Sequence, residues 1–219
     1  MLNIVLAVLP TILIIAYILW FDRYNKEPVG LLIMLFVFGC LSVIPASFFE
    51  SLTPRISSVH TYFGLFLYCL LAIALIEEGV KFFTTKILAY RNSAFDEIYD
   101  GIIYCVMVSL GFATIENIMY VQAYGTSAAL LRAITAVPAH TIFAVTMGYY
   151  LGLSKAFPRQ RSFYQLLSLT VPIILHGIYD FIIYLSFDWL MLLFVIYALY
   201  LYRKAFMLIK RTYNIEPFR

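Results

Sequence analysis

Long runs of apolar residues, separated by short polar segments, extend along the whole chain. A helix that crosses the hydrocarbon core of a bilayer needs about 20 mostly apolar residues. Seven runs approach or exceed this length: Leu2–Phe21, Val29–Phe49, Thr61–Ile87, Gly101–Val121, Ala128–Leu153, Phe163–Tyr184 and Phe187–Tyr202. The pattern therefore predicts an all-α fold, a polytopic membrane bundle of about seven transmembrane helices.

The composition agrees with a membrane protein and excludes several other classes. Of the 219 residues, 63% are hydrophobic and 12% are charged, compared with about 45–50% and about 25% in ordinary globular domains. A soluble monomer of this composition could not cover its own surface. The net charge of +3 is small and spread over the connections, so we expect no nucleic-acid binding. No boundary or repeat is visible, so residues 1–219 are predicted to form a single domain.

The basic residues of the connections fall almost entirely on one side of the predicted membrane. The connections after the first, third and fifth spans and the C-terminal tail contain nearly all of them, whereas the other connections contain only Arg55. The positive-inside rule then places the N-terminus outside and the C-terminus in the cytoplasm. A missed span would scramble this alternation, so it also supports seven spans.

Several ionisable side chains lie inside the predicted spans. A charge at the bilayer centre costs at least about 2.5–3.5 kcal/mol, so such groups face the bundle interior and are functional candidates by default. They are Glu77, Glu78, Lys81, Glu116, Arg132, His140, His176 and Asp180. We expect them to surround a polar cavity.

Helical spacing relates some of these residues to one another. Glu77 and Lys81 are four residues apart, as are His176 and Asp180, so each pair shares a helix face. Either pair could be purely structural. Two adjacent carboxylates, Glu77 and Glu78, have only one lysine near them on this helix, so one of the two acids lacks a partner of opposite charge. A buried carboxylate can serve as a general base or acid.

The segment Gly111–Asn117 and His140 belong to two other spans. The small residues of this segment permit close helix approach, and Asn117 is suited to a hydrogen bond across it. Glu116 is expected to reach a water-filled cavity. Taken alone, His140 would be interpreted as a residue that makes a hydrogen bond between helices. The intramembrane acids and His176 favour a role in chemistry instead.

These residue types fit three kinds of chemistry. Glu77 and His140 could direct water at a carbonyl group while His176 and Asp180 stabilise the oxyanion. A Glu–His–His set could hold zinc, which in catalytic sites takes three protein ligands and a water, although the HExxH signature is missing. The same groups could form a proton relay in a transporter. Residue types alone leave all three open.

The order of the motifs resembles a known family. Glu77–Lys81, Phe95–Tyr104, Gly111–Asn117, His140 and His176–Asp180 together resemble the PrsW family of bacterial polytopic membrane proteases. The resemblance covers nearly the whole chain. PrsW proteins look like members of a wider group that includes CAAX prenyl endopeptidases and bacteriocin-processing or immunity proteins. Lys81 departs from that group's arginine, at a spacing one residue shorter, and Asp180 departs from its commoner asparagine.

The resemblance implies a glutamate-type endopeptidase in a bacterial cell membrane. In the implied roles, Glu77 with His140 activates water, His176 with Asp180 supports the oxyanion, Glu78 with Lys81 tunes the pocket, and Glu116 and Asn117 support the site. No cofactor is expected, but zinc stays open, and its ligands would be Glu77, His140 and His176.

The resemblance also implies a substrate. PrsW-like proteins make the first, site-1 cut in single-pass, membrane-anchored anti-sigma factors, which leads to sigma factor release in a stress response. The alternatives are a CAAX-type prenyl endopeptidase and, outside enzymes, a proton-coupled transporter or an immunity-type binding protein. Rigid straight spans would place Glu77 several Å nearer the cytoplasm than His140 and His176, at about 1.5 Å per residue.

Overall fold

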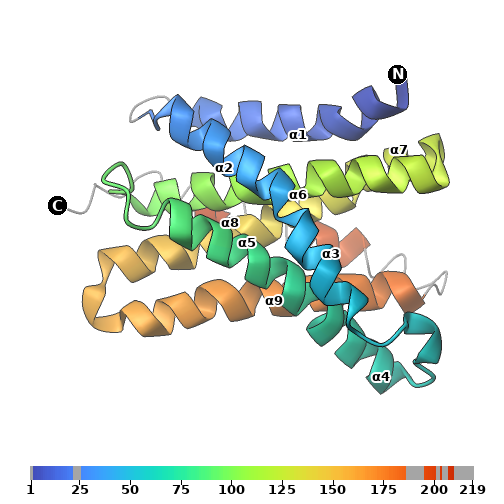
Figure 1. The fold of residues 1–219 in the computed structure, drawn as a ribbon. Coiled ribbons are helices and arrows are strands. Elements are labelled where there is room, and N and C mark those ends of the chain that lie inside the picture. Colours follow the sequence, from blue (N-terminus) through green and yellow to red (C-terminus); the bar gives the residue numbers. More distant parts are fainter. Residues whose placement is uncertain (1, 22–25, 186–194, 201–202, 204–206, 210–219) are drawn as a thin grey trace.

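The computed structural model describes residues 2–21, 26–185, 195–200, 203 and 207–209 (Figure 1). The α-helices are α1 (Leu2–Phe21), α2 (Val29–Leu41), α3 (Val43–Ser51), α4 (Tyr62–Leu67), α5 (Leu75–Leu88), α6 (Ile98–Tyr124), α7 (Thr126–Ile134), α8 (Ala136–Ala156) and α9 (Arg161–Leu185). Short 3-10 turns η1 (Ile56–Ser58) and η3 (Pro158–Gln160) precede α4 and α9, and a π-helical segment η2 (Tyr68–Ala74) joins α4 to α5.

The described part of the chain confirms the membrane bundle. It contains five helical stretches long and apolar enough to cross a membrane, Val29–Ser58, Tyr62–Leu88, Ile98–Tyr124, Leu130–Ala156 and Pro158–Leu185, and a shorter apolar helix, Ala7–Trp20. These six correspond to the first six predicted spans. The seventh, 187–202, lies largely outside the described residues.

Two spans that the sequence predicted as continuous are each divided into two helices. α2 ends at Leu41, four residues before Pro45, and α7 ends at Ile134, four residues before Pro138. A proline ring clashes with the carbonyl group four residues earlier and offers it no N–H. Each break therefore coincides with the carbonyl group that the proline leaves without a helical partner, whereas α1 and α9 continue past Pro10 and Pro172.

α6 is the central helix of the bundle. It is buried from Ile98 to Thr114. It packs most extensively against α8 and α2, and it also packs against α1. Its N-terminus is closed by a capping box, in which the Asp100 carboxylate accepts from the N–H groups of Asp96 and Glu97. Glu97 and Asp100 are thus helix-capping residues.

Glycines allow α6 and α8 to touch through their backbones. A Cβ added at Gly148 would lie 2.2 Å from the Gly101 carbonyl oxygen and 2.5 Å from Ile102 Cα. Backbone atoms cannot rotate out of the way, so the helices would have to separate. We expect Gly148→Ala to lower the stability of the protein by about 1–3 kcal/mol, measured as a lower unfolding midpoint in detergent.

Gly30→Ala is the matched control, because a Cβ at Gly30 meets no atom within 4 Å. It should leave the midpoint unchanged or raise it slightly. Equal midpoints for the two variants would show that the α6–α8 contact is looser than described.

Candidate active site

The two adjacent acids, Glu77 and Glu78, lie in the first turn of α5, directly after the π-helical segment η2. Lys81 follows one turn later, and its Nζ lies 3.0 Å from Glu77 Oε2 and 2.8 Å from Glu78 Oε1. All three side chains are buried. Glu77 and Lys81, which the spacing placed on one helix face, form an ion pair. Glu78 contacts the same ammonium group.

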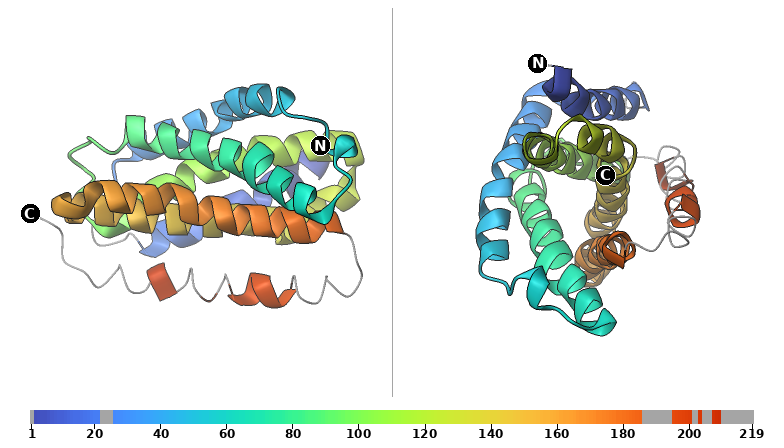
Figure 2. Two further views of the ribbon diagram at one scale, coloured as in Figure 1. Left: turned by 90° about the horizontal axis from the view of Figure 1, so that it is seen from below. Right: turned by 90° about the vertical axis from the view of Figure 1, so that its right-hand side faces the viewer.

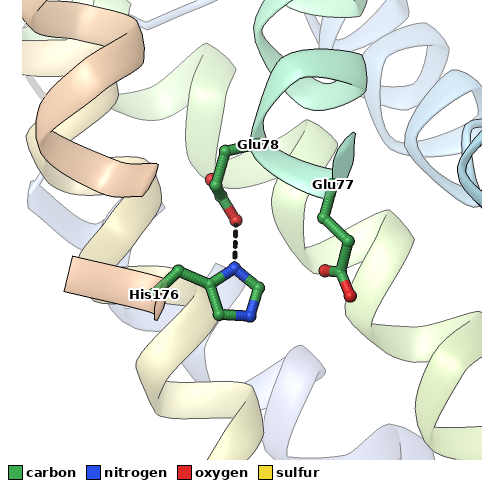
Figure 3. A group of neighbouring side chains, drawn as sticks. All are labelled: Glu77, Glu78 and His176. Carbon is green, nitrogen blue, oxygen red and sulfur yellow. Dashed lines mark hydrogen bonds and ion pairs between the residues drawn. The ribbon is translucent and has the colours of Figure 1, made fainter. Parts of the chain in front are cut away.

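His176 of α9 is held between two carboxylates. Its Nδ1 lies 3.0 Å from Glu78 Oε1, positioned to donate to it, and its Nε2 lies 3.4 Å from Asp180 Oδ2. Figure 3 shows Glu78 pointing at the ring, with the Glu77 carboxylate to one side of it. The pairing of His176 with Asp180 that the spacing predicted is therefore extended to a second helix.

His140 of α8 is held from two other directions. Its Nδ1 lies 3.1 Å from Lys81 Nζ, and its Nε2 lies 2.9 Å from Glu116 Oε2 on α6. An ammonium group can only donate, so Nδ1 is the acceptor and Nε2 carries the hydrogen. All three hydrogens of Lys81 then have acceptors, in Glu77, Glu78 and His140.

Arg132 of α7 completes the network. One guanidinium nitrogen lies 2.8 Å from Glu116 Oε2, and Nε donates to Asn117 Oδ1 over 2.9 Å. Asn117 in turn donates to the carbonyl oxygen of Ala7 on α1. The sequence marked Arg132 only as an intramembrane charge, because spacing cannot relate residues on different helices.

A cavity of about 570 Å³ opens beside this network. Its lining residues come mainly from α3, α6, α8 and α9, together with Glu77 of α5. In the end-on view of Figure 2, α3 and α5 lie on one side of the bundle and α8 and α9 on the other. Glu77 lines the cavity and is 6% exposed, whereas Glu78 is 0% exposed and lies behind it. Glu50 also lines the cavity. It was missed because α3 extends past the end of the predicted second span.

The structure thus brings together every residue that the sequence analysis singled out for the site. Straight spans would have placed Glu77 at a different depth in the membrane from His140 and His176. In the structure the three side chains nevertheless belong to one network, joined through Lys81 and Glu78. The long Lys81 side chain reaches one turn along α5 and bridges the acids to His140. Asn117 ties the network to α1 through its hydrogen bond to the carbonyl oxygen of Ala7.

Carboxylate and histidine atoms form two compact groups among the described residues. One is Glu77, Glu78 and His176, and the other is Glu77, Glu116 and His140, with the donor atoms of each within 4.8 Å of one another. The three residues expected to share a zinc ion are thus split between the groups, and only Glu77 belongs to both. Glu78 Oε2 has no hydrogen-bond partner among the described residues.

Comparison with known proteins places the chain among membrane proteases. A family model described as PrsW family intramembrane metalloprotease matches residues 27–205. Protease PrsW of Oceanobacillus iheyensis is 38% identical over 202 residues, which cover 90% of this chain and 92% of the relative. Those of Geobacillus kaustophilus and Bacillus subtilis are each 37% identical over 182 residues, covering 83% of this chain and 80% and 82% of the relatives. No solved structure matches the chain.

Proposed function

Because the chain belongs to the PrsW family of intramembrane proteases, we propose that it hydrolyses its substrate in this cavity, with Glu77 as the general base. One observation carries the assignment: of the two adjacent acids, only Glu77 lines the cavity, whereas Glu78 is enclosed. A carboxylate within reach of bound water can take its proton while the oxygen attacks the carbonyl carbon. The proton is then available for the leaving amine.

The other residues of the network have supporting roles in this proposal. Both nitrogens of His176 face carboxylates, an arrangement that the doubly protonated ring satisfies. A positive ring at the cavity wall stabilises the negative charge that develops on the carbonyl oxygen. Asp180, in place of asparagine, then helps to hold that ring rather than contacting the oxyanion. His140 uses both nitrogens within the network, which favours a hydrogen-bonding role over proton transfer.

Lys81 bears on whether the reaction uses a metal. The donors of both compact groups, histidine nitrogen and carboxylate oxygen, suit zinc in type. The ammonium of Lys81, however, contacts Glu77, Glu78 and His140 at 2.8–3.1 Å, so a positive charge already lies among donors of both groups. With Lys81 in place, a divalent cation does not fit, and we infer that none is required. The zinc content of a Lys81 variant tests this inference.

The proposed substrate is a single-pass, membrane-anchored anti-sigma factor, cut at its first site. The family resemblance is one support. The other is the position of the cavity, whose lining residues Glu50, Tyr124 and Tyr184 lie at or near the C-terminal ends of α3, α6 and α9. The first turn of α1 lies at the same end of the bundle (Figure 1). If that end faces outward, as the positive-inside rule indicates, the cut falls in the outer half of the membrane.

A tagged anti-sigma factor co-expressed with the wild-type protein is expected to yield a shortened, membrane-bound product. Immunoblotting of membranes measures it, and a Glu77→Gln variant at equal abundance is the control. Equal product from wild type and variant would assign the cut to another protease. Cleavage of other single-pass proteins but not of anti-sigma factors would reject the substrate and keep the peptidase.

A further inference from the structure

Arg132 has no part in the chemistry described so far, yet it is an intramembrane charge on a short helix whose apolar residues Leu130, Leu131 and Ile134 are exposed. We propose that Arg132 is a positioning residue that holds Glu116, and through Glu116 the ring of His140, in the arrangement that the reaction needs. This inference rests on the proposed function, because it concerns the same site.

The contacts of Arg132 all lie on one face of α6. Its guanidinium reaches the Glu116 carboxylate at 2.8 Å and the Asn117 side chain at 2.9 Å, and it stacks 3.9 Å above the ring of Tyr120. The planar guanidinium makes one hydrogen bond, one ion pair and one stacking contact at once, which a lysine ammonium cannot reproduce. Arg132 therefore fixes both the place of α7 on α6 and the orientation of Glu116.

A single oxygen atom connects Arg132 to the histidine. Glu116 Oε2 lies 2.8 Å from the Arg132 guanidinium and 2.9 Å from His140 Nε2. Without Arg132, the Glu116 side chain loses the contact that opposes its rotation away from His140. His140 would then be held by Lys81 alone, on its other nitrogen.

Asn117 makes the arrangement rigid from the other side. Its carbonyl oxygen accepts from Arg132 Nε, and its amide donates to Ala7 on α1. Asn117 is fully enclosed, and Arg132 lies at the cavity wall. Arg132 thus joins α1, α6 and α7 behind His140.

The test is steady-state cleavage by the purified, full-length protein. We expect Arg132→Gln to lower kcat by about 100-fold, the cost of a misplacement of about 1 Å caused by a change away from the chemistry, with KM nearly unchanged. Arg132→Lys keeps the charge but not the paired contacts, so it should recover only part of the rate. Arg91→Gln removes an exposed arginine and is the matched control.

Glu116→Gln should resemble Arg132→Gln, and the double variant should be no slower than the slower single variant, because both act through one contact. Unfolding midpoints are measured for each variant. A wild-type kcat in Arg132→Gln, or losses that multiply in the double variant, would overturn the proposal. If Arg132→Gln does not fold, a wild-type kcat in Arg132→Lys overturns it.

A second readout does not depend on cleavage, so it separates this inference from the proposed function. In protein labelled with 15N-histidine, the His140 ring signals are assigned by their loss in His140→Gln. We expect two well-separated nitrogen shifts in the wild type, from one fixed tautomer. In Arg132→Gln we expect a displaced Nε2 shift, because that N–H no longer meets the Glu116 carboxylate, while Lys81 still holds Nδ1. Identical spectra would reject the positioning role even if the substrate assignment were correct.

Discussion

Glu77→Gln is expected to lower the rate of substrate cleavage by about 100- to 10,000-fold, the usual contribution of a general base. Glutamine has the same shape as glutamate, and its carbonyl oxygen can still accept the hydrogen bond from Lys81. It cannot take a proton from water. The change therefore removes the chemistry while retaining most of the local packing, and the loss should appear in kcat rather than in KM.

Glu50→Gln is the matched control, since it makes the same substitution on the wall of the same cavity. It should retain a rate within a few-fold of wild type. Purified proteins in lipid nanodiscs, with a fluorescent single-pass substrate, provide the measurement. A rate loss shared equally by the two variants would indicate a general effect of cavity charge. Full activity of Glu77→Gln would exclude Glu77 as the base.

The sequence predicted the bundle because the bilayer imposes a simple rule on it. Runs such as Ile98–Tyr124 must be apolar and helical to cross, so hydropathy alone located the described spans. The breaks before Pro45 and Pro138 were not predicted, since hydropathy averages over the helix ends. The prolines that accompany them were nevertheless visible in the sequence.

The candidate residues of the site were also predicted from the apolar character of the bilayer. A charge is costly within a membrane, so Glu77, His140 and Asp180 were conspicuous. Their partners were harder to predict, because spacing relates residues on one helix but not on different helices. The contact of His176 with Glu78, and the bridge from Lys81 to His140, depend on how α5, α8 and α9 pack. The expected zinc ligands were split for this reason.

Lys81→Gln should have a large effect on stability as well as on activity. The substitution leaves Glu77 and Glu78 adjacent and buried without the ammonium that both contact. Removing one partner of a buried ion pair costs about 3–5 kcal/mol, a large share of the about 5–15 kcal/mol that stabilises a typical protein. We expect a much lower unfolding midpoint and little cleavage.

The same variant should bind zinc, and this is the sharper test of the role of Lys81. A divalent cation can replace the lost ammonium among the carboxylate and histidine donors, so added zinc should raise the midpoint of Lys81→Gln and be retained at about one ion per chain by elemental analysis. The wild type should retain none and cleave at the same rate in EDTA. Lys86→Gln is the control on the same helix, because Lys86 contacts Gln165 rather than the acids. A wild type that carries stoichiometric zinc and loses activity in EDTA would mean that Lys81 moves aside in the working enzyme, and the metal-free mechanism would be wrong.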